Sequence, residues 1–231
     1  MICMFGQEKG GVGKTTLAAH AAIYLFDQGY RVALVDCDKS ASASSWVRET
    51  EEGVAVFNVR NEADAKKVLL KIQNDFEYII CDSPGDDNRV IRTLMMVADK
   101  IVFPVGPSIL ELRVLASSIA SLKQAQQHRD GKPEGLIVCN MVKRNGRTSR
   151  ELPEVVAKLG VPVAKSKVRL LEAFRESAKQ ATVVTRMGLS MAMVDIEDLF
   201  HELFGVAPAC YRKTGKASGK KGDRAKRAGG V

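Results

Sequence analysis

Long hydrophobic runs are missing from this sequence of 231 residues. A membrane-spanning helix needs about 18 or more consecutive apolar residues, and no window of the chain supplies them. The first five residues lack the positive flank and the cleavage site of a secretory signal, and they continue directly into a glycine-rich loop. We therefore expect a cytoplasmic protein with no segment across a membrane.

Paired cysteines are missing as well. The five cysteines lie far apart, at positions 3, 37, 81, 139 and 210, and no C-x-x-C pair occurs. This spacing gives no support to the common zinc and redox motifs. Cys3, Cys81 and Cys139 stand inside short apolar runs and Cys37 follows another. We therefore expect small buried thiols in a reduced compartment.

Net charge is scarce in most of the chain, although the formal total is +8. Residues 212–231 hold eight basic side chains against one acidic one and so carry +7, whereas the first 211 residues carry only +1. Residues 213–231 also show no apolar periodicity. We predict one folded domain over residues 1–205 and a basic tail, disordered when unbound, over residues 206–231.

Short apolar runs alternate with helix-length segments along residues 1–205. The runs are continuously apolar, which predicts strands covered by helices on both faces. The expected strands are residues 2–5, 31–35, 54–58, 78–81, 100–105 and 135–140, with a shorter one at 161–164. The expected helices are residues 15–27, 63–74, 88–98, 109–127, 150–159 and 191–204. In the last helix, Asp195, Glu197, Asp198 and Glu202 are expected to face solvent. The sequence predicts an α/β fold with a doubly wound, mostly parallel sheet.

Residues 9–16 read Lys-Gly-Gly-Val-Gly-Lys-Thr-Thr and lie between the first expected strand and the first expected helix. Backbone N–H groups of such a loop converge on one point and the helix N-terminus adds partial positive charge, so the loop binds phosphate. Lys14 is expected to reach the β- and γ-phosphates, and the Thr15 hydroxyl to bind Mg²⁺. The usual motif has glycine where this chain has Glu8, and an additional lysine, Lys9, follows it. The predicted nucleotide-binding residues of the loop are Gly10, Gly11, Val12, Gly13, Lys14, Thr15 and Thr16.

Polar side chains follow three of the expected strands, at the edge of the sheet where ligands of this fold class bind. Asp36 and Asp38 come after the second strand, and Asn140 ends the strand at 135–140. Asp82 follows the apolar run 78–81 in the manner of a Walker B element and is expected to hold Mg²⁺ through water. Other interpretations exist: the paired aspartates are also typical of a helix cap, and Asn140 of a turn.

These motifs resemble those of the ParA/MinD family of ATPases, whose deviant Walker A loop carries a second lysine. The resemblance covers about residues 1–205, although Lys39 and Ser40 stand where the family often has Pro-Gln. It implies that Lys9 reaches across a dimer interface to the partner's phosphates and that Asp38 positions the attacking water. It also implies that Asp36 lies near the Mg²⁺ shell, that residues 83–85 sense the γ-phosphate, and that Asn140 contacts adenine. The implied cofactors are ATP and Mg²⁺, and the implied activity is slow ATP hydrolysis that serves as a switch.

Three functions of this family compete. A ParA-type partition ATPase forms a homodimer with ATP, binds DNA non-specifically, and segregates a plasmid, a chromosome or a similar cargo with a ParB-like or other activator protein. A MinD-type ATPase positions itself on a membrane, and a third kind of relative holds an iron–sulfur cluster between its subunits. The basic tail lacks the apolar face of a membrane-targeting helix, and cysteines within strands do not suit a shared cluster. We therefore favour a compact ParA-type protein that joins the nucleoid when ATP-bound, with the MinD type as the alternative.

Basic residues at 165–169, together with Arg175 and Arg186, lie where ParA-like proteins often contact DNA. Single residues of this kind are also typical of a solvated face. The sequence leaves open whether the folded domain or the tail binds DNA, and it identifies neither the cargo nor the activator.

Overall fold

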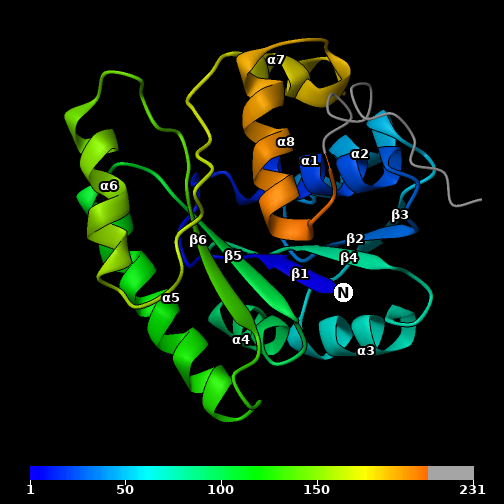
Figure 1. The fold of residues 1–231 in the computed structure, drawn as a ribbon. Coiled ribbons are helices and arrows are strands. Elements are labelled where there is room, and N and C mark those ends of the chain that lie inside the picture. The colour runs from blue at the N-terminus through cyan, green and yellow to red at the C-terminus, as the bar shows by residue number, and fades with distance from the viewer. Residues whose placement is uncertain (208–231) are drawn as a thin grey trace, which may run out of the picture.

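A six-stranded parallel sheet forms the centre of the computed structural model, which describes residues 1–207 (Figure 1). The strand order is β3-β2-β4-β1-β5-β6, and every pairing is parallel. The strands are β1 (Ile2–Phe5), β2 (Val32–Asp36), β3 (Ala55–Asn58), β4 (Tyr78–Asp82), β5 (Lys100–Val105) and β6 (Glu134–Cys139). The predicted doubly wound α/β fold is confirmed.

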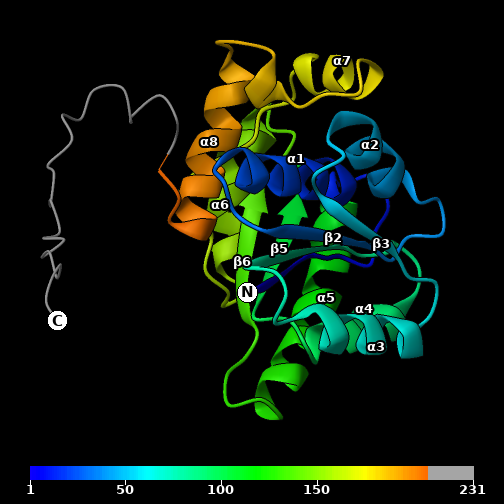
Figure 2. The same ribbon diagram turned by 90° about the vertical axis from the view of Figure 1, so that its right-hand side faces the viewer.

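Helices cover both faces of the sheet and bury a separate core on each (Figure 2). One core packs beneath α3, α4, α5 and α6, and the other beneath α1, α2 and α8. The helices are α1 (Lys14–Asp27), α2 (Ser42–Thr50), α3 (Glu62–Ile72), α4 (Asn88–Met95), α5 (Ile109–Gln127), α6 (Arg147–Ala157), α7 (Ala173–Lys179) and α8 (Met191–Phe204), with a 3₁₀ turn η1 (Val184–Arg186). Within residues 1–207, no helix is long and apolar enough to cross a membrane.

The register of the sheet brings the predicted site residues to one edge. Asp82 pairs with Phe5 of β1 on one side and with Asp36 of β2 on the other. The phosphate loop, the Asp38 loop and the segment after Asp82 therefore leave the sheet next to one another. Because these are carboxyl ends of parallel strands, this edge is where a ligand binds in such folds.

Four details differ from the sequence prediction. Residues 161–164 form no strand, because Val163 makes only an isolated bridge to Ile137. The expectation that Asp195 and Glu197 face solvent is wrong, since they are 6% and 5% exposed. The short helices α2 and α7 were not predicted.

The predicted buried cysteines are confirmed, whereas the predicted start of the tail is not. Cys3, Cys37, Cys81 and Cys139 are buried and free, as expected. Val206, placed by prediction in the tail, is 4% exposed, and its carbonyl accepts a hydrogen bond from the Tyr24 hydroxyl at 3.3 Å. The predicted basic, disordered tail and Cys210 otherwise lie outside the described residues, and the domain boundary stays a prediction.

Candidate nucleotide-binding site

The glycine-rich loop connects the buried strand β1 to α1, which begins at Lys14. Gly11 and Gly13 have φ angles of 79° and 93°, in the left-handed region that side chains with a Cβ rarely adopt. At Gly13 a Cβ would also collide with the amide nitrogen of Asn140. The glycines are thus required by the path of the loop itself.

Lys14 points into the loop and is almost fully buried, at 6% exposure. Its ammonium donates a hydrogen bond to the carbonyl of Lys9 at 2.8 Å. Burial lowers the pKa of Lys14, while the nearby carboxylates of Asp82, Asp38 and Asp86 oppose that shift. A buried ammonium among carboxylates at a loop of this kind is suited to neutralise phosphate charge.

Lys9 lies on the outer side of the loop, where its side chain is 33% exposed. Its ammonium is 3.9 Å from the carboxylate of Glu111 on α5. Lys9 is not among the residues that line the phosphate cavity, whereas Lys14 is. The structure therefore separates the two lysines that the sequence brings together in one motif.

Thr15 and Asp82 meet at the inner edge of the site, where the Thr15 hydroxyl donates to Asp82 Oδ2 at 2.7 Å. Asp82 Oδ1 is buried and has no hydrogen-bond partner among the described residues. Burial raises the pKa of Asp82 to about 7, partly offset by the bond from Thr15. A buried carboxylate oxygen beside a hydroxyl fits a hydrated Mg²⁺ ion, which keeps several waters and needs few protein ligands. Within the described part of the chain no cluster of three or more His, Cys, Asp or Glu forms a denser metal site.

Asp36 holds the loop that carries Asp38. Its Oδ1 accepts the N–H of Asp38 at 3.0 Å, and its Oδ2 accepts the N–H of Ser44 at 2.8 Å. Asp36 is 1% exposed, so both oxygens serve the fold of this turn. Asp38 itself is half-buried and lines the phosphate cavity. Its approach to a metal or water stays a prediction, as does the metal role of Asp36.

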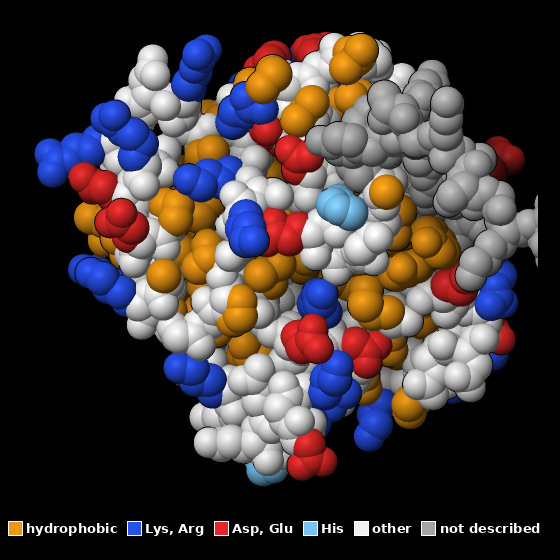
Figure 3. Space-filling model, in the orientation of Figure 1, with side chains coloured by type: hydrophobic (Ala, Val, Ile, Leu, Met, Phe, Trp, Pro, Cys, Tyr) orange, Lys and Arg blue, Asp and Glu red, His pale blue; other side chains and the backbone are white. Residues whose placement is uncertain are grey.

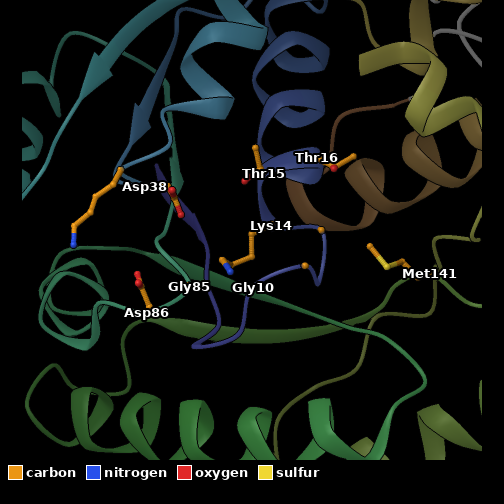
Figure 4. Close-up of a pocket in the computed structure, with 11 residues that line it drawn as sticks. Gly10, Lys14, Thr15, Thr16, Asp38, Gly85, Asp86 and Met141 are labelled. Atoms are coloured by element: carbon orange, nitrogen blue, oxygen red, sulfur yellow. The ribbon is translucent and has the colours of Figure 1, made fainter. Parts of the chain in front are cut away.

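Two adjoining cavities lie along the loop. The first, of about 570 Å³, is lined by the phosphate loop together with Asp38, Lys39, Gly85, Asp86 and Met141 (Figure 4). The second, of about 430 Å³, shares Gly11, Gly13, Thr16 and Met141 with the first and extends over an apolar floor. That floor includes Leu17, Leu170, Leu171, Phe174 and Ala178. The pair suits a polar phosphate chain joined to a flat apolar base.

Asn140 lies between the two halves of this site. It is 5% exposed, and its Nδ2 donates to the Val12 carbonyl at 2.7 Å. It also lines the second cavity, so the predicted adenine contact is compatible with its position but stays a prediction.

Gly85, in the segment expected to sense the γ-phosphate, packs against the loop so closely that a Cβ there would lie 3.1 Å from the Gly10 nitrogen. Sequence reasoning missed the apolar floor and part of the phosphate cavity. The exposed Asp86 and Lys39, together with Met141, line that cavity without having been predicted to do so. No local motif marks Leu170, Leu171 or Phe174, which reach the site only through the path of the chain after β6.

The predicted DNA-contact residues do not form one surface: some line a basic cleft and others lie outside it. Lys165 and Lys167 are exposed and line a cleft of about 410 Å³. Other basic residues lining it are Lys143, Arg144 and Arg150, in and before α6, and Figure 3 shows Lys and Arg side chains gathered over α6.

Of the three arginines of the prediction, one lines the cleft and two lie outside it. Arg169 lines the cleft but is bound to Asp195, with Nη2 2.5 Å from Oδ1. Arg186 pairs with Asp27 and Glu51 at 2.5 and 2.8 Å, away from the cleft. Arg175 lines the apolar cavity.

Comparison with known proteins identifies the family. A family model described as the CobQ/CobB/MinD/ParA nucleotide binding domain matches residues 3–184. Maintenance of carboxysome distribution protein A of Halothiobacillus neapolitanus is 28% identical over 185 residues, 78% of this chain and 84% of that protein. Protein ParA of Rhizobium radiobacter is 25% identical over 143 residues, 61% of this chain and 64% of that protein. The solved structure of apo McdA from Cyanothece superposes with a TM-score of 0.74 at 14% identity, covering 87% of this chain and 98% of that one, and so shares the fold. The chain belongs to the ParA/MinD family of P-loop ATPases.

Proposed function

We propose that this protein is a ParA-type ATPase switch that forms a homodimer with Mg-ATP and then binds DNA non-specifically. The observation that carries the proposal is the separation of the two loop lysines. Lys14 is buried at the phosphate cavity, whereas Lys9 is partly exposed outside it. From that position Lys9 can exchange its contact with Glu111 for nucleotide phosphates held by a second copy of the chain.

Each residue of the site has a defined part in this proposal. Lys14 and the loop N–H groups bind the phosphates, while Thr15 and Asp82 hold Mg²⁺, which neutralises charge on the transferred phosphoryl group. Asp38 orients the attacking water and Asp36 keeps the Asp38 turn in place. Asn140 and the apolar floor receive the adenine ring. Because the cross-subunit cation arrives only in the dimer, hydrolysis in the monomer is slow.

DNA binding is assigned to the basic cleft and assisted by the basic tail. The cleft presents five cations, namely Lys143, Arg144, Arg150, Lys165 and Lys167, with Asp198 as the exposed acidic residue among its lining. Such a surface contacts phosphates irrespective of base sequence. A homodimer presents two clefts, and this duplication strengthens binding through avidity.

The names of the relatives support a partition or positioning role. One relative maintains the distribution of carboxysomes and another is called ParA. We therefore assign a ParB-like or other cargo-bound activator as partner, a plasmid, chromosome or protein assembly as cargo, and a cytoplasmic, nucleoid-associated location. Because the family also includes MinD, a MinD-type function on a membrane is the alternative proposal.

Binding to a random duplex in Mg²⁺ with ADP, or with a non-hydrolysable ATP analogue, tests the DNA assignment. We expect binding only with the analogue, weakened by salt, and reduced in the variant carrying Lys165→Ala and Lys167→Ala. Loss of two phosphate contacts in each of the two clefts of the dimer, four in all, lowers the log–log salt slope by about 3.6. The matched control is Lys66→Ala with Lys67→Ala, two exposed lysines on α3. Binding to anionic liposomes in place of DNA would support the MinD-type alternative.

A further inference from the structure

Four contacts dock residues 7–9, at the start of the phosphate loop, onto α5, and one of them runs from the Ser117 hydroxyl to the Glu8 carboxylate at 3.2 Å. Gln7 Nε2 donates to the Glu111 carbonyl at 3.4 Å, and the Glu8 N–H donates to Ser118 Oγ at 3.4 Å. The Lys9 ammonium lies 3.9 Å from Glu111 Oε1. The additional lysine of the loop is therefore held along a helix of its own subunit.

Glu111 has a second bond that does not depend on Lys9. Its Oε2 accepts the N–H of Gly106 at 2.5 Å, and its side chain is only 17% exposed. It is the third residue of α5, and an acidic residue in the first turn also favours the helix dipole. The carboxylate therefore stays in place when Lys9 leaves it. The long, partly exposed ion pair to Lys9 is the weak bond of the two.

We infer that Glu111 is the resting partner of Lys9 and restrains ATP-dependent dimerisation, a role that rests on the proposed function. Lys9 cannot pair with Glu111 and with a phosphate on a second subunit at the same time. Two such pairs must separate for each homodimer that forms. The restraint sets how much protein and ATP are needed before the dimer appears.

Glu111 acts through Lys9 and not on the nucleotide directly. It is not among the residues that line the phosphate cavity. The carboxylates that shift the pKa of Lys14 are Asp82, Asp38 and Asp86. Glu111 is a positioning residue in this sense, and its removal is expected to change dimerisation without changing how one subunit binds ATP.

Glu111→Gln isolates this effect, because a glutamine oxygen still accepts the Gly106 N–H while the charge is lost. The measurement is the dimer dissociation constant of the full chain by analytical ultracentrifugation, with Mg²⁺ and a non-hydrolysable ATP analogue. We expect dimers about 2- to 30-fold tighter than wild type, since two exposed ion pairs no longer have to be broken. The affinity of the monomer for the analogue, followed by fluorescence of the single tryptophan, Trp46 on α2, is expected to change less than about twofold.

Glu111 could also act only by stabilising the start of α5 through its bond to the Gly106 N–H, and two further variants separate this capping role from the restraint on Lys9. Glu8→Gln is the matched control, because that neighbouring carboxylate accepts a hydrogen bond from Ser117, and its dimers should match wild type. Glu111→Ser removes the carboxylate in a second way and should also tighten the dimer. A capping role alone would lower the thermal midpoint and leave dimers unchanged or weaker.

Dimers of both Glu111 variants that are no tighter than wild type overturn the inference. A wild-type chain that stays monomeric with Mg²⁺ and the analogue contradicts the proposed function instead, so the two failures are distinguishable.

Discussion

The inner and outer sides of the phosphate loop differ in how firmly they are held. On the inner side Lys14 is buried, bonded to the Lys9 carbonyl and near three aspartates. On the outer side Lys9, five residues away, has one ion pair at 3.9 Å and a third of its side chain exposed. The inner side is thus preorganised within one subunit, and the outer side is able to exchange one partner for another. The difference supports the proposal that one subunit binds the nucleotide by itself and that the switch operates in the dimer.

Replacement of each lysine gives the strongest test of this comparison. Lys14→Ala is expected to weaken ATP binding by the monomer about 100-fold or more, because charge-assisted contacts to phosphate are lost. Lys9→Ala should leave that affinity nearly unchanged, yet abolish ATP-dependent dimers and slow hydrolysis about 10³-fold or more, as loss of a cation supplied in trans does. Nucleotide titration, a sizing column and phosphate release measure the three quantities. Full dimerisation of Lys9→Ala, or equal losses of ATP affinity in both variants, would remove the distinction between the two sides.

Asp38 tests whether chemistry can be separated from assembly. Asp38→Ala should retain ATP-bound dimers but slow phosphate release by about 10²- to 10⁴-fold, since the group proposed to orient the attacking water is gone. Asp86→Ala is the matched control, because Asp86 lines the same cavity from an exposed position. Unchanged phosphate release in Asp38→Ala would refute the assignment.

Features encoded by neighbouring residues were the ones that the sequence predicted well. Buried strands such as β1 and β5 stand out because short apolar runs with flanking turn residues need no distant information. The phosphate loop is similarly local, since eight consecutive residues define it. The edge of the sheet that carries Asp36 and Asp82 followed from the rule for parallel strands.

Features made by distant residues were missed. Periodicity assigns Asp195 to the outer face of α8, but Arg169, 26 residues earlier, binds it there and Asp195 is shielded from solvent. The apolar floor under Asn140 comes from Leu170, Leu171 and Phe174, which carry no motif. Residues 161–164 are apolar enough for a strand, yet tertiary contacts allow only one bridge. In each case a long-range partner decided the outcome.

His20 lies on α1, the helix that follows the phosphate loop, and supports the inner side of that loop from behind. This fully buried ring lies on α1, where Nδ1 bonds to the Thr16 carbonyl at 2.8 Å and Nε2 accepts the Val184 N–H at 3.2 Å. It also contacts Trp46 and Phe174 edge-on. A ring that accepts through Nε2 must donate through Nδ1 and is therefore neutral. His20 thus connects α1 to α2 and to the segment around Phe174, which lines the second, apolar cavity.

Acid should weaken this connection. Burial lowers the pKa of His20 to about 4, below the ordinary 6.5 of the unfolded chain. The unfolded state therefore binds the proton first, and the stability contributed by the neutral ring is present above pH 6.5 and lost as the pH falls toward 4. Between pH 7 and pH 5 the expected loss is about 2 kcal/mol. Asp82 acts in the opposite direction, because its raised pKa of about 7 makes the folded state bind the proton first.

The histidine contribution is therefore read as a difference between variants. Urea unfolding of the nucleotide-free chain at pH 7 and pH 5 is compared in wild type, His20→Gln and the control His128→Gln, whose ring is exposed. His128→Gln should follow wild type, while His20→Gln should be less stable at pH 7 and lose about 2 kcal/mol less than wild type on acidification. Equal pH dependence in all three chains would mean that His20 is already protonated or not coupled to folding. In that case the inner side of the loop would be held by the Thr15–Asp82, Lys14–Lys9 and Asn140–Val12 hydrogen bonds without a contribution from His20.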